Sequence, residues 1–123
     1  MNSRKVGDFY EKIACEYLTE NEAEVVERNF RCKFGEVDII IRDGEYLAFV
    51  EVKYRNSNYS GKANEAVHHK KQRIISKCAN CYCMLKNLGQ MTAIRFDVIT
   101  IDADVIEWIK GAYDYSSSEN TGR

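Results

Sequence analysis

The sequence lacks several features that would assign it to a familiar class of protein. No apolar run approaches the roughly 20 residues that a membrane-spanning helix needs, and the opening residues MNSRKVGDFYEK contain no apolar signal segment. We therefore expect a cytoplasmic protein without a membrane partner. The sequence also has no internal repeat, no glycine-rich phosphate loop and no G-x-S-x-G motif, which argues against repeat proteins, P-loop proteins and hydrolases with that nucleophile turn.

Cysteine is present in an odd number, five, and a chain of 123 residues can build a core without disulfides, so we expect reduced thiols. Cys78, Cys81 and Cys83 form the pattern C-x-x-C-x-C, with Cys15 and Cys32 upstream. An iron–sulfur cluster or a zinc site is one interpretation. Packing in a helix core is the other, and we favour it because Cys83 does not share the helix face of Cys78 and Cys81.

What is present fits a single globular domain. Hydrophobic residues make up 45% of the sequence and include eight Tyr and five Phe, enough for a sheet and a few helices around one core. We expect residues 1–113 to form one domain and the polar residues 114–123 to form a disordered tail.

The stretch Gly35–Arg55, GEVDIIIRDGEYLAFVEVKYR, has the pattern of a buried β-hairpin. Its two halves are mostly apolar on both faces, and Asp43-Gly44 between them favours a two-residue turn. Because side chains alternate along a strand, Glu51 and Lys53 lie on the same face of the second strand. Charged residues therefore occur in strands that are otherwise apolar.

These charges suggest a metal site. An unpaired buried carboxylate is costly, so Asp38 and Glu51 need a partner or an open cleft. If they face each other across the strands, they form with the backbone carbonyl of Val52 an oxygen site suited to Mg²⁺ or Mn²⁺. Lys53 would then orient or deprotonate a water or neutralise a phosphate, as in metal-assisted phosphodiester hydrolysis. The alternative is structural: Asp38 caps or pairs with a lysine, and Glu51 with Lys53 marks a charged strand end.

The remaining segments predict an α/β fold with a mixed sheet of four to five strands. Apolar residues at three- and four-residue spacing predict helices at Arg4–Glu20 and at Asn64–Asn87, with Asn64 as the N-cap of the second. Strands are predicted at Glu24–Phe30 and Thr92–Ile101, followed by a short edge element at Val105–Lys110.

Basic residues are concentrated in one part of the chain, although the net charge is only −1. The segment Val52–Lys77 contains seven basic residues and one acidic residue. Such a segment beside acidic metal ligands suits a phosphate backbone, and a solvated helix face explains it almost as well. Within it, Asn56–Lys62 is predicted to be a flexible loop near the site; it is either an ordinary connection or a DNA contact in which Tyr54 or Tyr59 stacks on a base.

The order of these motifs resembles a known family. Asp38 followed by Glu51-Val52-Lys53 is similar to the D…(D/E)-x-K signature of the restriction-endonuclease-like nuclease superfamily, although Val37 stands where many members have proline. The whole chain resembles the bacterial YraN family of that superfamily, whose members are small and largely uncharacterised. The matching residues run almost end to end and are Gly7, Glu11, Ala14, Tyr17-Leu18, Arg28-Asn29, Gly35-Glu36-Val37-Asp38, Phe49-Val50-Glu51-Val52-Lys53, Arg55, Ala66-Val67, Lys71-Gln72, Arg95-Phe96-Asp97-Val98, Trp108-Ile109-Lys110 and Ala112.

This resemblance implies a restriction-endonuclease-like core in which an N-terminal helix and one long helix flank the sheet. It also implies that Glu11 on the first helix joins Asp38 and Glu51 at the metal, and that Lys71 and Gln72 face the site or the substrate. From the residues alone, Glu11 is better explained as a solvent-facing glutamate.

We therefore expect a Mg²⁺- or Mn²⁺-dependent endonuclease that hydrolyses DNA, with the catalytic residues Asp38, Glu51, Lys53 and Glu11. The residues expected to contact the DNA backbone are Arg55, Lys70, Lys71 and Gln72. No element resembles a base-reading helix or finger, so we expect selectivity for DNA structure, such as a branch or a flap, in repair or recombination. A chain this small favours a symmetric dimer. The alternative function is a nucleic-acid-binding module that keeps the fold without cutting.

Overall fold

The computed structural model describes residues 2–55 and 67–116. The elements follow in the order α1 (Ser3–Glu20), β1 (Glu24–Cys32), β2 (Gly35–Asp43), β3 (Tyr46–Arg55), α2 (His69–Leu85), β4 (Ile94–Asp102) and β5 (Val105–Tyr113). The predicted loop 56–62 and residues 117–123 of the predicted tail lie outside the described residues.

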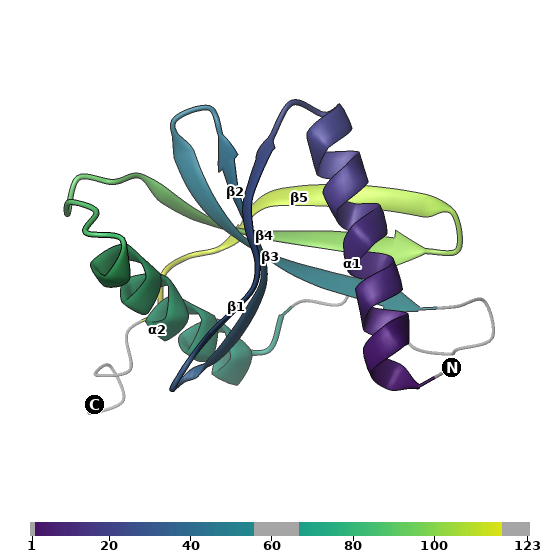
Figure 1. Ribbon diagram of the computed structural model, residues 1–123, viewed down its shortest axis with the longest axis horizontal. Helices are drawn as coiled ribbons and strands as arrows, with labels where there is room; N and C mark the ends of the chain where they lie inside the picture. The colour runs from purple at the N-terminus through teal and green to yellow at the C-terminus, as the bar shows by residue number, and fades with distance from the viewer. Residues whose placement is uncertain (1, 56–66, 117–123) are drawn as a thin grey trace.

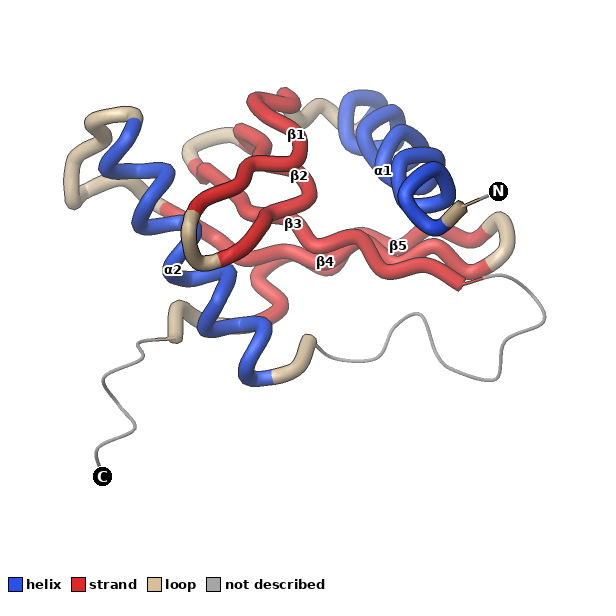
Figure 2. The backbone as a smooth tube through the Cα atoms, turned by 60° about the horizontal axis from the view of Figure 1, so that its bottom comes forward, coloured by secondary structure: helices blue, strands red, loops and turns tan. Residues whose placement is uncertain are grey.

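The strands form one mixed sheet in the order β1-β2-β3-β4-β5. β3 and β4 are parallel, and the other three neighbouring pairs are antiparallel. Figures 1 and 2 show α1 and α2 on opposite faces of this sheet. The expected α/β fold, with a mixed sheet flanked by an N-terminal helix and one long helix, is confirmed, and it is consistent with a restriction-endonuclease-like core.

The first helix forms where the sequence predicts it. Asn2 caps it, because the Asn2 side chain accepts a hydrogen bond of 2.9 Å from the backbone N–H of Lys5. Its inner face buries Ala14 and Leu18 completely, and truncating a fully buried Leu18 to alanine would cost about 2–5 kcal/mol of stability. No helix in the described ranges is long and apolar enough to cross a membrane.

The second helix begins at His69, so the predicted start with Asn64 as the N-cap is wrong. Val67 and His68 precede the helix in non-helical conformation. His68 is the N-cap instead, and its side chain accepts a hydrogen bond of 3.3 Å from the backbone N–H of Lys70. A histidine at this position is not among the usual capping residues, which is why the sequence pattern did not locate the boundary.

The apolar side chains separate into two cores, one on each face of the sheet. Ile39 and Ile41 pack in the core beneath α1, whereas Val37 packs in the core beneath α2. Strict alternation would put all three on one face. The alternation breaks beside Asn29, which lies opposite Asp38 between the register pairs of β1 and β2 and has a φ of 55°, in the left-handed region. The end of the β1–β2 hairpin is therefore turned toward α2, and Asp38 lies at the bend.

Candidate functional site

The strands β2 and β3 separate where the candidate site begins. Their backbone pairing runs from Asp43–Tyr46 to Ile39–Val50; the next positions in that register are Asp38 and Glu51. There the Asp38 side chain takes the place of a backbone partner, because its Oδ2 accepts a hydrogen bond of 2.9 Å from the N–H of Val52. The N–H and carbonyl of one strand residue point to the same side, so the Val52 carbonyl points to the β2 side of β3 as well.

Glu51 is a buried carboxylate with half of its hydrogen-bonding capacity unused. Its side chain is 13% exposed, and its Oε2 lies 3.3 Å from Lys71 Nζ. Its Oε1 is buried and has no hydrogen-bond partner among the described residues. Burial and the neighbouring charge of Asp38 raise the pKa of Glu51 to about 7, against the opposing effect of Lys71 and Lys53.

Glu11 approaches the same region from α1. Its side chain is also 13% exposed, and its Oε1 lies 3.6 Å from Arg28 Nη2, too far for a hydrogen bond. This oxygen likewise has no hydrogen-bond partner in the described part of the chain. Burial and the charge of Asp38 raise the pKa of Glu11 to about 7, although Asn29 and Arg28 oppose this. Glu11 is therefore not the solvent-facing residue that its position in the sequence favours.

Asp38 lies between the other two carboxylates. Burial raises its pKa, and so does the charge of Glu36; the N–H of Val52 and the charge of Lys71 act in the opposite direction. Its charge in turn raises the pKa of both Glu11 and Glu51. Three carboxylates from α1, β2 and β3 thus share a region in which the basic partners do not compensate all of the negative charge.

The donor set fits a hard divalent cation. Among the described residues no three His, Cys, Asp or Glu side chains converge closely enough to enclose a metal ion. Mg²⁺ does not require such a cage, since it usually binds one or two carboxylates and keeps several waters. Two buried carboxylate oxygens without partners, the carboxylate of Asp38 and the Val52 carbonyl are oxygen ligands of the type that Mg²⁺ and Mn²⁺ prefer.

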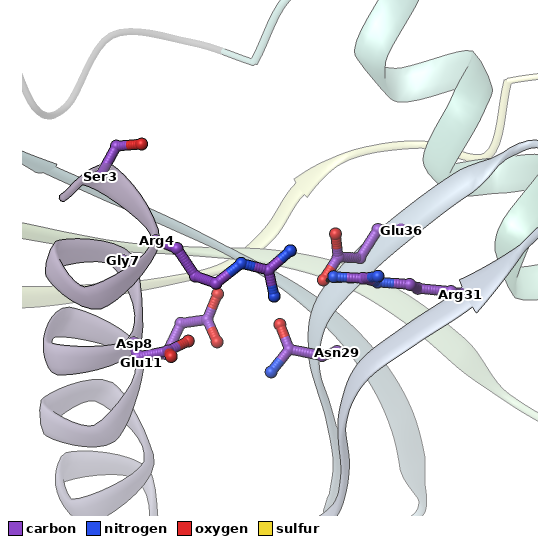
Figure 3. Close-up of a pocket in the computed structure, with 8 residues that line it drawn as sticks. All are labelled: Ser3, Arg4, Gly7, Asp8, Glu11, Asn29, Arg31 and Glu36. Atoms are coloured by element: carbon purple, nitrogen blue, oxygen red, sulfur yellow. Dashed lines mark ion pairs between the residues drawn. The ribbon is translucent and has the colours of Figure 1, made fainter.

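A cavity of about 420 Å³ gives access to this region from the side of α1. Figure 3 shows its lining, with Asp8 and Glu11 on the helix facing Asn29, Arg31 and Glu36 on the β1–β2 hairpin. The Arg4 guanidinium extends into the space between them (Figure 3). Glu36 lies 3.6 Å from Arg31, so it faces the cavity with a partner of its own.

The residues expected to contact DNA differ in how free their side chains are. Lys70 is exposed at the start of α2, and Lys71 is 45% exposed while it pairs with Glu51. Gln72 Nε2 instead donates a hydrogen bond of 2.7 Å to the Val67 carbonyl. Arg55 Nε lies 3.1 Å from Asp102 Oδ2. The structure thus brings Lys71 to the carboxylates and gives Gln72 and Arg55 intramolecular partners.

Three residues near the carboxylates were not predicted from the sequence as metal ligands or catalytic residues. Arg28 and Asn29 come from β1 and lie beside Glu11; both are among the residues that resemble the YraN family. Tyr113 on β5 has a buried hydroxyl without a hydrogen-bond partner in the described residues. Burial raises its pKa, and the charge of Glu51 adds to this effect. Nothing in the sequence pattern indicates that Tyr113 is close to Glu51.

A second buried acid, Asp97 on β4, has a different environment. It is completely buried and accepts hydrogen bonds of 2.9 and 2.8 Å from Arg95, 2.9 Å from Trp108 Nε1 and 2.9 Å from the N–H of Gly111. Arg95 also donates a hydrogen bond of 2.8 Å to Asp43. Asp97 is therefore part of a buried ion pair that anchors β4, and the chain itself supplies its hydrogen-bond partners.

Comparison with known proteins finds relatives over most of the chain. The model of a family described as "Uncharacterised protein family UPF0102" matches residues 10–101. A UPF0102 protein of Lachnoclostridium phytofermentans is 40% identical over 114 residues, covering 93% of this chain and 97% of the relative. Another from Vibrio cholerae is 41% identical over 115 residues, covering 91% and 94%. A third, from Aliivibrio fischeri, is 43% identical over 114 residues, covering 90% and 93%.

Proposed function

This chain belongs to the uncharacterised protein family UPF0102, the YraN family of the sequence analysis, and we propose that it is a metal-dependent endonuclease acting on DNA. The family description names no activity, so the support comes from the site. The observation that carries the proposal is the pair of buried carboxylate oxygens, on Glu51 and Glu11, that have no hydrogen-bond partner in the described residues and lie beside Asp38. Leaving such groups uncompensated is costly unless they bind something.

A divalent cation, Mg²⁺ or Mn²⁺, is the ligand that this arrangement favours. Asp38 and Glu51 would hold it together with the Val52 carbonyl, and Glu11 would contribute directly or through a water. When bound, the cation would supply electrostatic stabilisation of the charge that develops on the scissile phosphate and would lower the pKa of a water.

The basic residues around the carboxylates would handle the phosphate and the water. Lys53 lies close enough to Glu51 to lower its pKa, and we assign it the role of orienting the attacking water or withdrawing its proton. Lys71 neutralises Glu51 in this structure. Once a cation takes over that task, Lys71 is exposed enough to contact a backbone phosphate instead.

The substrate would be recognised through its backbone. The segment Val52–Lys77 carries seven of the basic residues and a single acid, and Lys70 and Lys71 at the start of α2 belong to it. Phosphate contacts give affinity without sequence information, which suits a nuclease that selects a DNA structure, such as a flap or a junction, in repair or recombination. Action in the cytoplasm, as a homodimer large enough to span a branched duplex, completes the proposal.

A second candidate function is a nucleic-acid-binding module that does not cut. The observation in its favour is that, in the parts of the chain that the structure describes, three metal-ligating side chains do not converge. Such a protein would use the same basic segment to hold DNA for a partner.

The experiment that separates the two functions is cleavage of labelled duplex, single strand, flap and four-way junction DNA with Mg²⁺ or Mn²⁺. We expect metal-dependent cutting of at least one substrate, reduced by about 10²-fold or more in Glu51→Ala and in Lys53→Ala. Glu16→Ala and Lys12→Ala change exposed residues of α1 and should cut as the wild type does. A wild type that shifts one substrate in a gel but cuts none with either metal would favour the binding module.

A further inference from the structure

Outside the carboxylate site, the fold brings one distant thiol, on β1, against two thiols that lie one turn apart on α2. Cys32 at the end of β1 lies with its Sγ 3.4 Å from the Sγ of Cys78 on α2. Cys81 lies one turn further along α2, close enough to Cys32 that each thiol shifts the pKa of the other. Cys83 belongs to the same side of the sheet but not to this group. The third thiol of the group is therefore Cys32. The C-x-x-C-x-C spacing alone would instead suggest Cys83.

The backbone of the β1–β2 hairpin holds Cys32 against α2. Cys32 is paired in register with Gly35, where β2 begins. A Cβ at position 35 would lie 2.6 Å from Cγ2 of Ile74 and 3.8 Å from Sγ of Cys78. Only glycine fits at such a distance, so the hairpin lies directly on the helix face that carries the other two thiols. The proximity of Cys32 and Cys78 is thus a product of the packing and not of side-chain rotation alone.

The three thiols are chemically unequal. Partial burial raises the pKa of Cys32, but hydrogen bonds from the N–H groups of Phe34 and Gly35 and from the two neighbouring thiols outweigh burial, and its pKa lies below the ordinary value. Burial and the contact with Cys32 raise the pKa of Cys78 to about 12 and also raise that of Cys81. Of the charged groups nearby, Lys33 lowers the pKa of Cys81 and Glu36 raises that of Cys78. Cys32 is also partly exposed, whereas Cys78 is buried.

We propose that Cys32 and Cys78 form a redox-sensitive dithiol, a modification site at which a partly exposed nucleophilic thiol is oxidised and a buried neighbour closes a disulfide. Cys81 is the second thiol able to close it. This site is separate from the carboxylates, and the proposal stands whether or not the chain is a nuclease.

The chemistry requires an oxidant of the peroxide class. The Cys32 thiolate attacks one oxygen of hydrogen peroxide; an S–O bond forms, the O–O bond breaks and hydroxide leaves, which gives the sulfenic acid. The sulfur of Cys78 then attacks the sulfur of Cys32, the S–O bond breaks and the S–S bond forms. The departing hydroxide takes up the proton of Cys78 as water. Two thiols and one peroxide thus give one disulfide and two waters, and the disulfide would tie the β1–β2 hairpin to α2.

The test is peroxide oxidation of the reduced full chain, followed by intact mass and peptide mapping. We expect a loss of 2 mass units for the one disulfide, with Cys32 linked to Cys78. In Cys78→Ser, Cys32 should be trapped by a sulfenic-acid reagent such as dimedone or be linked to Cys81. Cys32→Ser should form no disulfide within this group, and Cys83→Ser should behave as the wild type does.

Three outcomes would overturn the proposal. One is a wild-type chain in which Cys15 or Cys83 reacts with peroxide while Cys32 stays reduced. Another is oxidation that produces only links between chains. The third is a stoichiometric zinc ion in freshly purified protein that Cys32→Ser loses, because the thiols would then be structural metal ligands.

Discussion

Asp97 on β4 and the pair Glu51 and Glu11 are buried carboxylates that differ in how fully the chain compensates their charge. Asp97 accepts four hydrogen bonds from Arg95, Trp108 and the backbone, and Arg95 is shared with Asp43. On the neighbouring strand β3 and on α1, Glu51 and Glu11 each keep an oxygen without a hydrogen-bond partner in the described residues. The charge of Asp97 is compensated fully by the chain itself, whereas the charges of Glu51 and Glu11 are compensated only in part, by Lys71 and Arg28.

The difference indicates what each group is for. A buried charge whose partners are all supplied by the protein anchors strands and leaves nothing to bind a ligand. A buried carboxylate whose pKa is raised to about 7 is held at a cost in stability, and such groups mark sites where a ligand completes the structure. The same chemical group, a carboxylate, therefore serves as an anchor on β4 and as a candidate ligand on β3.

The largest expected effect is the loss of folding stability when Asp97 is replaced. Asp97→Ala leaves the Arg95 guanidinium and the Trp108 N–H buried without their acceptor, so we expect a loss of about 3–5 kcal/mol in the free energy of unfolding. Urea denaturation of the two proteins measures this directly. Asp104→Ala, in the exposed β4–β5 turn, is the matched control, and a loss as small in Asp97→Ala as in this control would contradict the anchor role.

The next largest expected effect is a dependence of folding stability on pH, which originates in Glu11 and Glu51. The folded pKa values of Glu11 and Glu51 lie near 7, above the ordinary glutamate value of 4.5, so the folded chain binds more protons than the unfolded chain between these pH values. Their contribution to stability is complete below about pH 4.5 and is lost as the pH rises through 7, by an amount on the order of 1–3 kcal/mol. Denaturation from pH 5 to pH 8 without metal measures the slope.

Glu51→Gln tests the source of that slope. The variant removes the titrating group and keeps its shape, so we expect it to be at least as stable as the wild type at pH 8 while its metal-dependent cleavage falls by about 10²-fold or more. An equally steep fall in stability with pH in Glu51→Gln would place the titration elsewhere.

The smallest expected effect concerns Lys71. Because this lysine is half exposed, its ion pair with Glu51 is screened by solvent, and Lys71→Met should lower the free energy of unfolding at pH 8 by less than about 1 kcal/mol. We expect a larger effect on DNA binding, seen as a weaker salt dependence of the dissociation constant. Lys86→Met, at the other end of the same helix, is the matched control outside the basic segment, and equal salt slopes for the two variants would argue against a phosphate contact by Lys71.

The sequence predicts this fold well because its signals are local. The Gly35–Arg55 hairpin has a turn dipeptide and apolar strands on both sides, and both features act within a few residues. The start of α2 was misplaced because His68 is an unusual cap. The bend at Asn29, which carries Val37 to the other face, depends on a single residue in left-handed conformation, and no periodicity reveals it.

The candidate site was predictable only in part, because some of its residues are neighbours in the sequence and others meet only through packing. Asp38, Glu51 and Lys53 belong to one hairpin, so the alternation of side chains already suggests that they are neighbours. The burial of Glu11 and the approach of Tyr113 to Glu51 depend on how α1 and β5 pack. The contact between Cys32 and Cys78 spans 46 residues, and only the packed structure brings the two thiols together.

The central claim is that the carboxylates of α1, β2 and β3 form a divalent cation site, and Mn²⁺ binding measured by calorimetry at pH 8 tests it most directly. We expect the wild type to bind Mn²⁺ and Glu16→Gln, an exposed change on α1, to bind it equally well. Asp38→Asn and Glu51→Gln should each weaken binding by at least about tenfold. Equal binding by all four proteins, or no binding by the wild type, would contradict the account.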